Sequence, residues 1–118
     1  MNINRSSIFK NGRENKLRDL EKQFHEALVN LDRIAWLKLG YNASRFRQML
    51  FEHGALKTVR MLLGSSVVQY GFTKLWELNR LDLTVEALIL KSPWDKLFSD
   101  DEKAIARQRL MEYGYKPD

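Results

Sequence analysis

The chain has 118 residues, a net charge of +5 and no cysteine. This length suits one domain rather than two, and a hydrophobic content of 44% argues against a wholly disordered chain. Because there is no cysteine, disulfide scaffolds, thiolate zinc sites and cysteine nucleophiles are excluded.

Two features of the sequence bear on where the protein resides. The longest uninterrupted aliphatic run covers only residues 87–90, whereas a membrane-spanning helix needs about 20 apolar residues. Residues 1–16 are polar and lack the apolar stretch of a secretory signal. We therefore expect a cytoplasmic protein with no membrane association.

The first element in chain order is a polar, basic segment over residues 1–15, which predicts a flexible arm. The remaining residues, 16–118, are expected to form a single helical domain. Its first helix is predicted over residues 16–39, and Gly40 follows as a C-terminal cap. Apolar residues recur in this helix at spacings of three and four, which is typical of an amphipathic helix. They are Leu17, Leu20, Phe24, Ala27, Leu28, Leu31, Ile34 and Ala35.

Two short helices are predicted next, over residues 43–53 and 55–63, on either side of Gly54. Asn42 is expected to be the N-cap of the first of them. Together they have the outline of a helix-turn-helix motif. An ordinary pair of short helices has the same outline, so both interpretations stay open.

In the C-terminal half, capping residues mark where helices begin. Thr84 precedes a predicted helix over residues 85–90. Ser99 and Glu102 have the spacing of a capping box at the start of a final helix over residues 100–113. No alternating strand pattern occurs. The predicted fold class is therefore all-α, a compact bundle of five to seven helices in which a long N-terminal helix is followed by short ones.

Three side chains in this half are expected to be buried. Ile105 and Leu110 are predicted to point inward from the final helix. Glu86 lies in an apolar stretch and is expected to be partly buried and paired with a cation, for which Arg80 is the candidate.

Two stretches of the C-terminal half carry a recognisable pattern: GFTKLWELNRLDLTVEALIL over residues 71–90 and LFSDDEKAIARQRLMEYGY over residues 97–115. They resemble the corresponding part of a family of small bacterial helical proteins of uncharacterised function. The resemblance extends over roughly residues 40–115. It implies one compact helical domain of bacterial origin and carries no activity.

Positive charge is concentrated in the first half of the chain. Residues 33–60 contain six Lys and Arg against Glu52 alone, whereas residues 61–118 contain eight basic and nine acidic side chains. A basic half-chain indicates a polyanionic partner, most simply DNA or RNA. The leading functional prediction is a non-enzymatic nucleic-acid-binding or regulatory module, against the alternative of ordinary solvated helix faces. The expected contacts are Arg45, Arg47, Lys57 and Arg60.

Two other functions stay open. One is a protein–protein interaction module or homodimer formed through the long first helix. The other is an RNA-cleaving domain, because Arg47, followed by five residues and His53, resembles the signature of the HEPN ribonucleases. That resemblance implies a dimer in which His53 acts as general acid or base. However, six residues of a continuous helix rotate by about 240°, which turns the two side chains to different faces.

No metal site and no cofactor are expected. His25 stands four residues after Glu21 on one predicted helix face, and His53 is the other histidine. A closed zinc site normally needs four ligands, so the pair on the helix is interpreted as surface residues.

Overall fold

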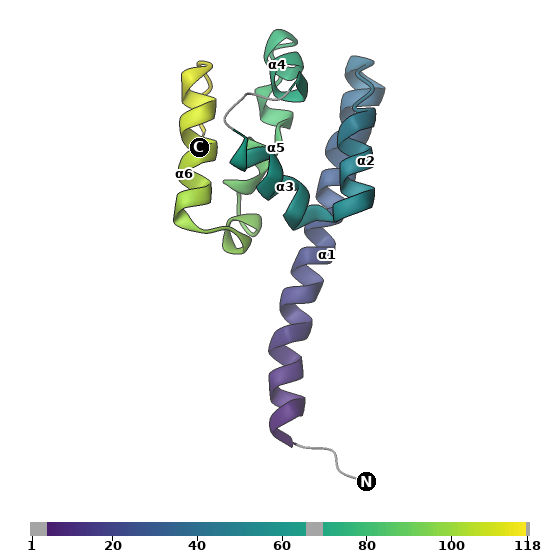
Figure 1. Cartoon of the computed structure of the whole chain (residues 1–118), viewed down its shortest axis with the longest axis vertical. Coiled ribbons are helices and arrows are strands. Elements are labelled where there is room, and N and C mark those ends of the chain that lie inside the picture. The colour runs from purple at the N-terminus through teal and green to yellow at the C-terminus, as the bar shows by residue number, and fades with distance from the viewer. Residues whose placement is uncertain (1–4, 66–69, 118) are drawn as a thin grey trace.

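The computed structural model describes residues 5–65 and 70–117, with side chains over residues 16–65 and 71–117. Within these ranges the chain is all-α, with six α-helices, two short 3-10 helices and no strand (Figure 1). The predicted fold class is confirmed. The elements are α1 (Arg5–Leu39), α2 (Ser44–His53), α3 (Ala55–Gly64), α4 (Tyr70–Glu77), η1 (Leu81–Leu83), α5 (Val85–Ile89), η2 (Trp94–Leu97) and α6 (Asp100–Glu112).

Helix α1 has 35 residues, a length of about 52 Å at 1.5 Å per residue. Its first half extends away from the other helices, and its second half packs beside them (Figure 1). The predicted start at Lys16 is wrong, because the helix begins at Arg5. Extending an existing helix avoids the cost of nucleation, and no proline interrupts residues 5–15. Residues 1–4 lie outside the described residues, and the mobility of the arm stays a prediction.

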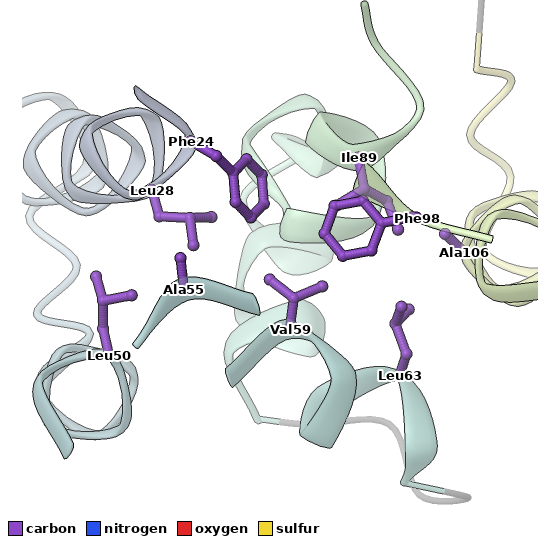
Figure 2. Packing of buried hydrophobic residues seen from close by; sticks show 9 residues of the cluster. All are labelled: Phe24, Leu28, Leu50, Ala55, Val59, Leu63, Ile89, Phe98 and Ala106. Atoms are coloured by element: carbon purple, nitrogen blue, oxygen red, sulfur yellow. The ribbon is translucent and has the colours of Figure 1, made fainter. Parts of the chain in front are cut away.

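The main core holds α1 against the rest of the domain (Figure 2). Phe24 and Leu28, four residues apart on α1, are completely buried. The Phe24 ring lies 5.4 Å from that of Phe98, centroid to centroid, in an edge-to-face arrangement. The buried members of this cluster are Phe24, Leu28, Leu50, Ala55, Val59, Leu63, Ile89, Phe98 and Ala106. Because α1 buries an i, i+4 pair here, its second half is fixed relative to α3.

A second, smaller core lies among the C-terminal elements. Phe72, Leu81, Ala87 and Leu110 are buried together, and the ring of Tyr113 packs edge-to-face on Phe72 at 5.0 Å. Leu110 points inward as predicted, but the same prediction for Ile105 is wrong, since that side chain is 42% exposed. The inward face of α6 is formed by Ala106, Arg109 and Leu110, and Ile105 is turned about 100° from Ala106.

The capping predictions for Thr84 and for Ser99 with Glu102 are confirmed. The Thr84 hydroxyl accepts a hydrogen bond from the Ala87 N–H at 3.1 Å. The Ser99 hydroxyl accepts from the Glu102 N–H at 3.1 Å, and the Glu102 carboxylate accepts from the Ser99 N–H at 2.8 Å, which completes the capping box. These local hydrogen bonds fix where α5 and α6 begin.

The turn between α2 and α3 depends on Gly54, whose φ of +79° disfavours residues with a side chain. The hydroxyl of the buried Thr58 donates to the Met49 carbonyl at 3.0 Å and ties α3 to α2. The predicted N-cap of α2 is wrong, because Ala43 occupies that position without a side-chain cap. The Asn42 amide oxygen instead accepts from the Arg47 guanidinium at 3.3 Å.

One buried ion pair joins α5 to α6. Glu86 is buried as predicted, but its partner is Arg109 at 2.9 Å rather than Arg80. Arg80 pairs with its near neighbour Asp82 at 3.0 Å. Arg109 also donates to the carbonyls of Leu62 at 3.1 Å and Ser65 at 3.0 Å, at the C-terminal end of α3. This guanidinium therefore neutralises a buried carboxylate and satisfies carbonyls that a helix end leaves unpaired.

Replacing Arg109 with Met should lower the free energy of unfolding by about 3–5 kcal/mol, because Glu86 would stay buried without a counter-charge. Urea denaturation followed by circular dichroism measures this change. The matched control is Arg107→Met on the exposed side of the same helix, which should alter stability by no more than about 0.5 kcal/mol. Equal stability of the two variants would contradict the structural role given to Arg109.

Candidate nucleic-acid interface

An open groove of about 780 Å³ lies between α1 and α3. One wall comes from α1, where Arg18, Glu21, Lys22 and His25 share one helix face at spacings of three and four. The other wall comes from the end of α2 and from α3; its polar and charged members are His53, Lys57 and Arg60. The groove therefore gathers four Lys and Arg side chains and two histidines against a single carboxylate.

Three of these cations form no ion pair among the side chains that the structure describes. Arg18, Lys22 and Lys57 are exposed, and none of them forms an ion pair with any side chain in the described ranges. Three unpaired cations face one carboxylate, that of Glu21. The walls therefore carry an excess of positive charge that a polyanion can neutralise.

Arg60 has a different role from Lys57, although both line the groove. Its Nε donates to the Glu102 carboxylate at 2.8 Å, and its Nη2 donates to the Leu97 carbonyl at 3.2 Å. The guanidinium also lies over the Phe98 ring, 5.7 Å from the centroid. Arg60 therefore ties α3 to the segment before α6, and its charge is already compensated.

The other two predicted contacts, Arg45 and Arg47, do not line this groove. Arg47 lies on α2 and binds Asp32 of α1 through two nitrogens, at 2.9 and 3.0 Å. The hydrogen bond with Asp32 and the charge of its carboxylate raise the pKa of the Arg47 guanidinium. Arg47 thus fastens α2 to α1, while Arg45 lines a separate cavity. Of the four predicted residues, Lys57 and Arg60 line the groove and Arg45 and Arg47 do not.

The packing of α2 and α3 also bears on the helix-turn-helix interpretation. Helices α2 and α3 follow each other across Gly54 as that motif requires. However, α3 buries Ala55, Thr58, Val59 and Leu63, and its exposed side chains Lys57, Arg60 and Met61 face the groove whose other wall is α1. Since α1 flanks the outer face of α3, this helix is not presented alone as a recognition helix is. The helix-turn-helix interpretation is therefore not supported by the way α3 is packed.

Arg47 and His53, the pair on which the ribonuclease alternative depends, are not brought together. Both belong to α2, but Arg47 is engaged by Asp32, whereas His53 lines the groove. The His53 Nε2 lies 3.8 Å from a carboxylate oxygen of its neighbour Glu52. The side chains leave the helix in different directions, as the rotation of about 240° over six residues requires.

No cluster of three or more His, Asp or Glu side chains able to hold a metal ion occurs in the described parts of the chain. None of the helices in these ranges combines the length and the apolar character needed to cross a membrane. Comparisons with protein-family models, with characterised proteins and with solved structures found no match.

Arg18 and Lys22 were not predicted as contacts, and His25 and His53 were candidates only for metal binding and catalysis. A partial signal exists, because Arg18, Lys22 and His25 repeat at spacings of four and three on one side of α1. What the sequence lacks is a local indication that this side faces Lys57, which is 35 residues beyond Lys22. That proximity follows from the burial of Phe24 and Leu28 against α3.

Glu102 offers a test of the Arg60 contact through pH. Partial burial raises the pKa of the Glu102 carboxyl, but the Ser99 N–H and the Arg60 guanidinium together lower it further, so its pKa lies below the usual value. A carboxyl with a lowered folded-state pKa stabilises the protein above its unfolded pKa, and this stabilisation is lost as the pH falls through the folded pKa.

Glu102→Gln should therefore lower the free energy of unfolding at pH 7 by about 1 kcal/mol. The difference in the free energy of unfolding between this variant and the unaltered protein should become smaller below a pH of about 4.3. Urea titrations from pH 7 down to pH 3 measure it, with Glu77→Gln, at an exposed position, as control. A difference that stays constant over this range would contradict the role given to the charged Glu102.

Proposed function

We propose that this protein is a non-enzymatic nucleic-acid-binding module, cytoplasmic and bacterial, that holds the phosphate backbone in the groove between α1 and α3. The observation that carries the proposal is that cations on both walls, Arg18 and Lys22 on α1 and Lys57 on α3, form no ion pair with the described side chains. Lysine and arginine side chains that neutralise phosphates supply most of the sequence-independent affinity for nucleic acids.

Each predicted residue has a distinct part in this proposal. Lys57 contacts phosphate directly, because it is exposed and forms no ion pair with the side chains in the described ranges. Arg60 holds the wall in position, since its guanidinium is bound to Glu102. Arg47 acts in the same indirect way through Asp32. Arg45 lies outside the groove and is not retained as a contact.

The projecting half of α1 supports the same function. Arg18 and Lys22 are the 14th and 18th of the 35 residues of α1, and the first half of this helix extends beyond the other helices (Figure 1). The sequence before Arg18 is also basic, with Arg5, Lys10, Arg13 and Lys16 against Glu14. This arrangement suits an extended polymer better than a compact anion.

The test is a fluorescence-anisotropy titration against duplex DNA, single-stranded DNA and RNA at several salt concentrations. Binding of the unaltered protein should weaken as salt is added. Binding releases cations from the phosphates, and this release is less favourable at a higher salt concentration. The double variant Lys22→Ala/Lys57→Ala should bind more weakly, with a slope of log affinity against log salt that is smaller by roughly one to two.

The control removes the same charge from elsewhere on the molecule. Arg33 and Lys38 are exposed on α1 and do not line the groove, so Arg33→Ala/Lys38→Ala should leave the salt slope nearly unchanged. Equal losses in the two double variants would mean that only net charge matters and would remove the assignment to the groove. No binding of any nucleic acid at low salt would remove the function itself.

One observation favours the second candidate, a protein-interaction module or homodimer. The second half of α1 exposes Val29, Trp36 and Leu37 at 45, 52 and 70%, and Phe51 on α2 is 90% exposed. Large apolar side chains exposed to solvent are typical of interaction surfaces where they form one patch. A mass that rises with protein concentration, without affinity for nucleic acid, would select this candidate over the proposed function.

A further inference from the structure

A second concavity, separate from the basic groove, lies between the α1–α2 pair and the α4–α5 region. Its volume is about 260 Å³. The walls are mostly apolar, with Leu31, Phe46 and Met49 on one side and Phe72, Leu75 and Val85 on the other. Protein interiors normally leave few voids larger than a water molecule. Sites for drug-sized ligands start at about 300 Å³, so this cavity suits a smaller, mainly apolar molecule.

The charged groups around the cavity determine which polar group such a molecule carries. Two carboxylates, those of Asp32 and Glu86, belong to the lining. Each is already bound to a guanidinium at 2.9 Å, Asp32 to Arg47 and Glu86 to Arg109. Neither carboxylate is therefore left to attract a cation.

Arg45 is the lining residue with unused charge. Its side chain is exposed, and it forms no ion pair with any side chain in the described ranges. Arg47 and Arg109, which do not line the cavity, balance the charges of Asp32 and Glu86, so that the charge of Arg45 has no counter-charge among the described lining residues. The surplus positive charge favours an anionic group on the bound molecule, positioned towards Arg45.

We propose that this cavity binds a small amphipathic carboxylic acid, with its apolar body between the α1–α2 pair and the α4–α5 region and its carboxylate at Arg45. The proposal goes beyond nucleic-acid binding and rests on different residues, because Arg45 is not part of the basic groove. The proposed cavity ligand and the proposed nucleic-acid binding can therefore be refuted independently of each other.

The test compares three probes of equal chain length, octanoate, octanol and octylamine, by isothermal titration calorimetry on the full chain. Octanoate should bind most tightly and octylamine least. Arg45→Ala should weaken octanoate binding by roughly three- to tenfold and leave octanol binding unchanged. The control Arg33→Ala, at an exposed position of α1 outside the cavity, should bind octanoate as the unaltered protein does.

A second variant tests the cavity rather than the charge. Ala35 is 5% exposed and lines the cavity, so Ala35→Met should fill part of the space and weaken binding of octanoate and octanol alike. Urea denaturation checks that this variant folds. If Ala35→Met does not fold, Arg45→Ala still decides the test, because Arg45 is exposed and its replacement leaves the core intact. Octylamine binding as tightly as octanoate, undiminished octanoate binding by Arg45→Ala, or no octanoate binding at millimolar concentration would each overturn the proposal.

Discussion

The burial of Phe24 and Leu28 is the interaction on which the rest of this structure depends. These two side chains are fully buried and belong to the same core cluster as Val59 of α3 and Phe98. Burying two large apolar side chains contributes roughly 1.5–3 kcal/mol for each of them. Because both side chains lie on one face of α1, their burial sets the rotation of this helix about its own axis relative to α3. The face that carries Arg18, Lys22 and His25 thereby becomes one wall of the groove.

Ion pairing then decides which cations are available. Arg47, Arg60 and Arg109 look equivalent in the sequence, but each is bound to a carboxylate on another element. A guanidinium can bind carboxylate and carbonyl oxygens in a fixed geometry, which suits it to joining helices. Lys22 and Lys57 stay exposed. In this domain several arginines serve the architecture, and lysines on the groove walls supply much of the free charge.

The parts of the fold that could be predicted from sequence are those determined by neighbouring residues. The capping roles of Thr84 and of Ser99 with Glu102 depend on residues three positions apart, and they were found in advance. The partner of Glu86 was not, because Arg109 is 23 residues away, on a different helix. The start of α1 was also missed, since a polar sequence without proline is compatible with either a helix or an extended arm.

The same distinction explains the candidate site. The charge distribution along the sequence predicts a basic half and a contact at Lys57, and Lys57 remains the central contact of the proposal. Arg47 and Arg60 were predicted contacts too, but no local pattern in the sequence shows that they form ion pairs with Asp32 and Glu102. Separating a free cation from a paired one required the packing of α1, α2, α3 and α6.

Amide chemical-shift mapping tests the central claim most directly. In this measurement, short single-stranded and duplex oligonucleotides are added to the ¹⁵N-labelled full chain. The account predicts that the largest shifts lie at both walls of the groove, around Arg18, Lys22 and His25 on α1 and around Lys57 on α3. Shifts confined to the surroundings of Arg45, or spread evenly over the exposed lysines and arginines, would contradict it.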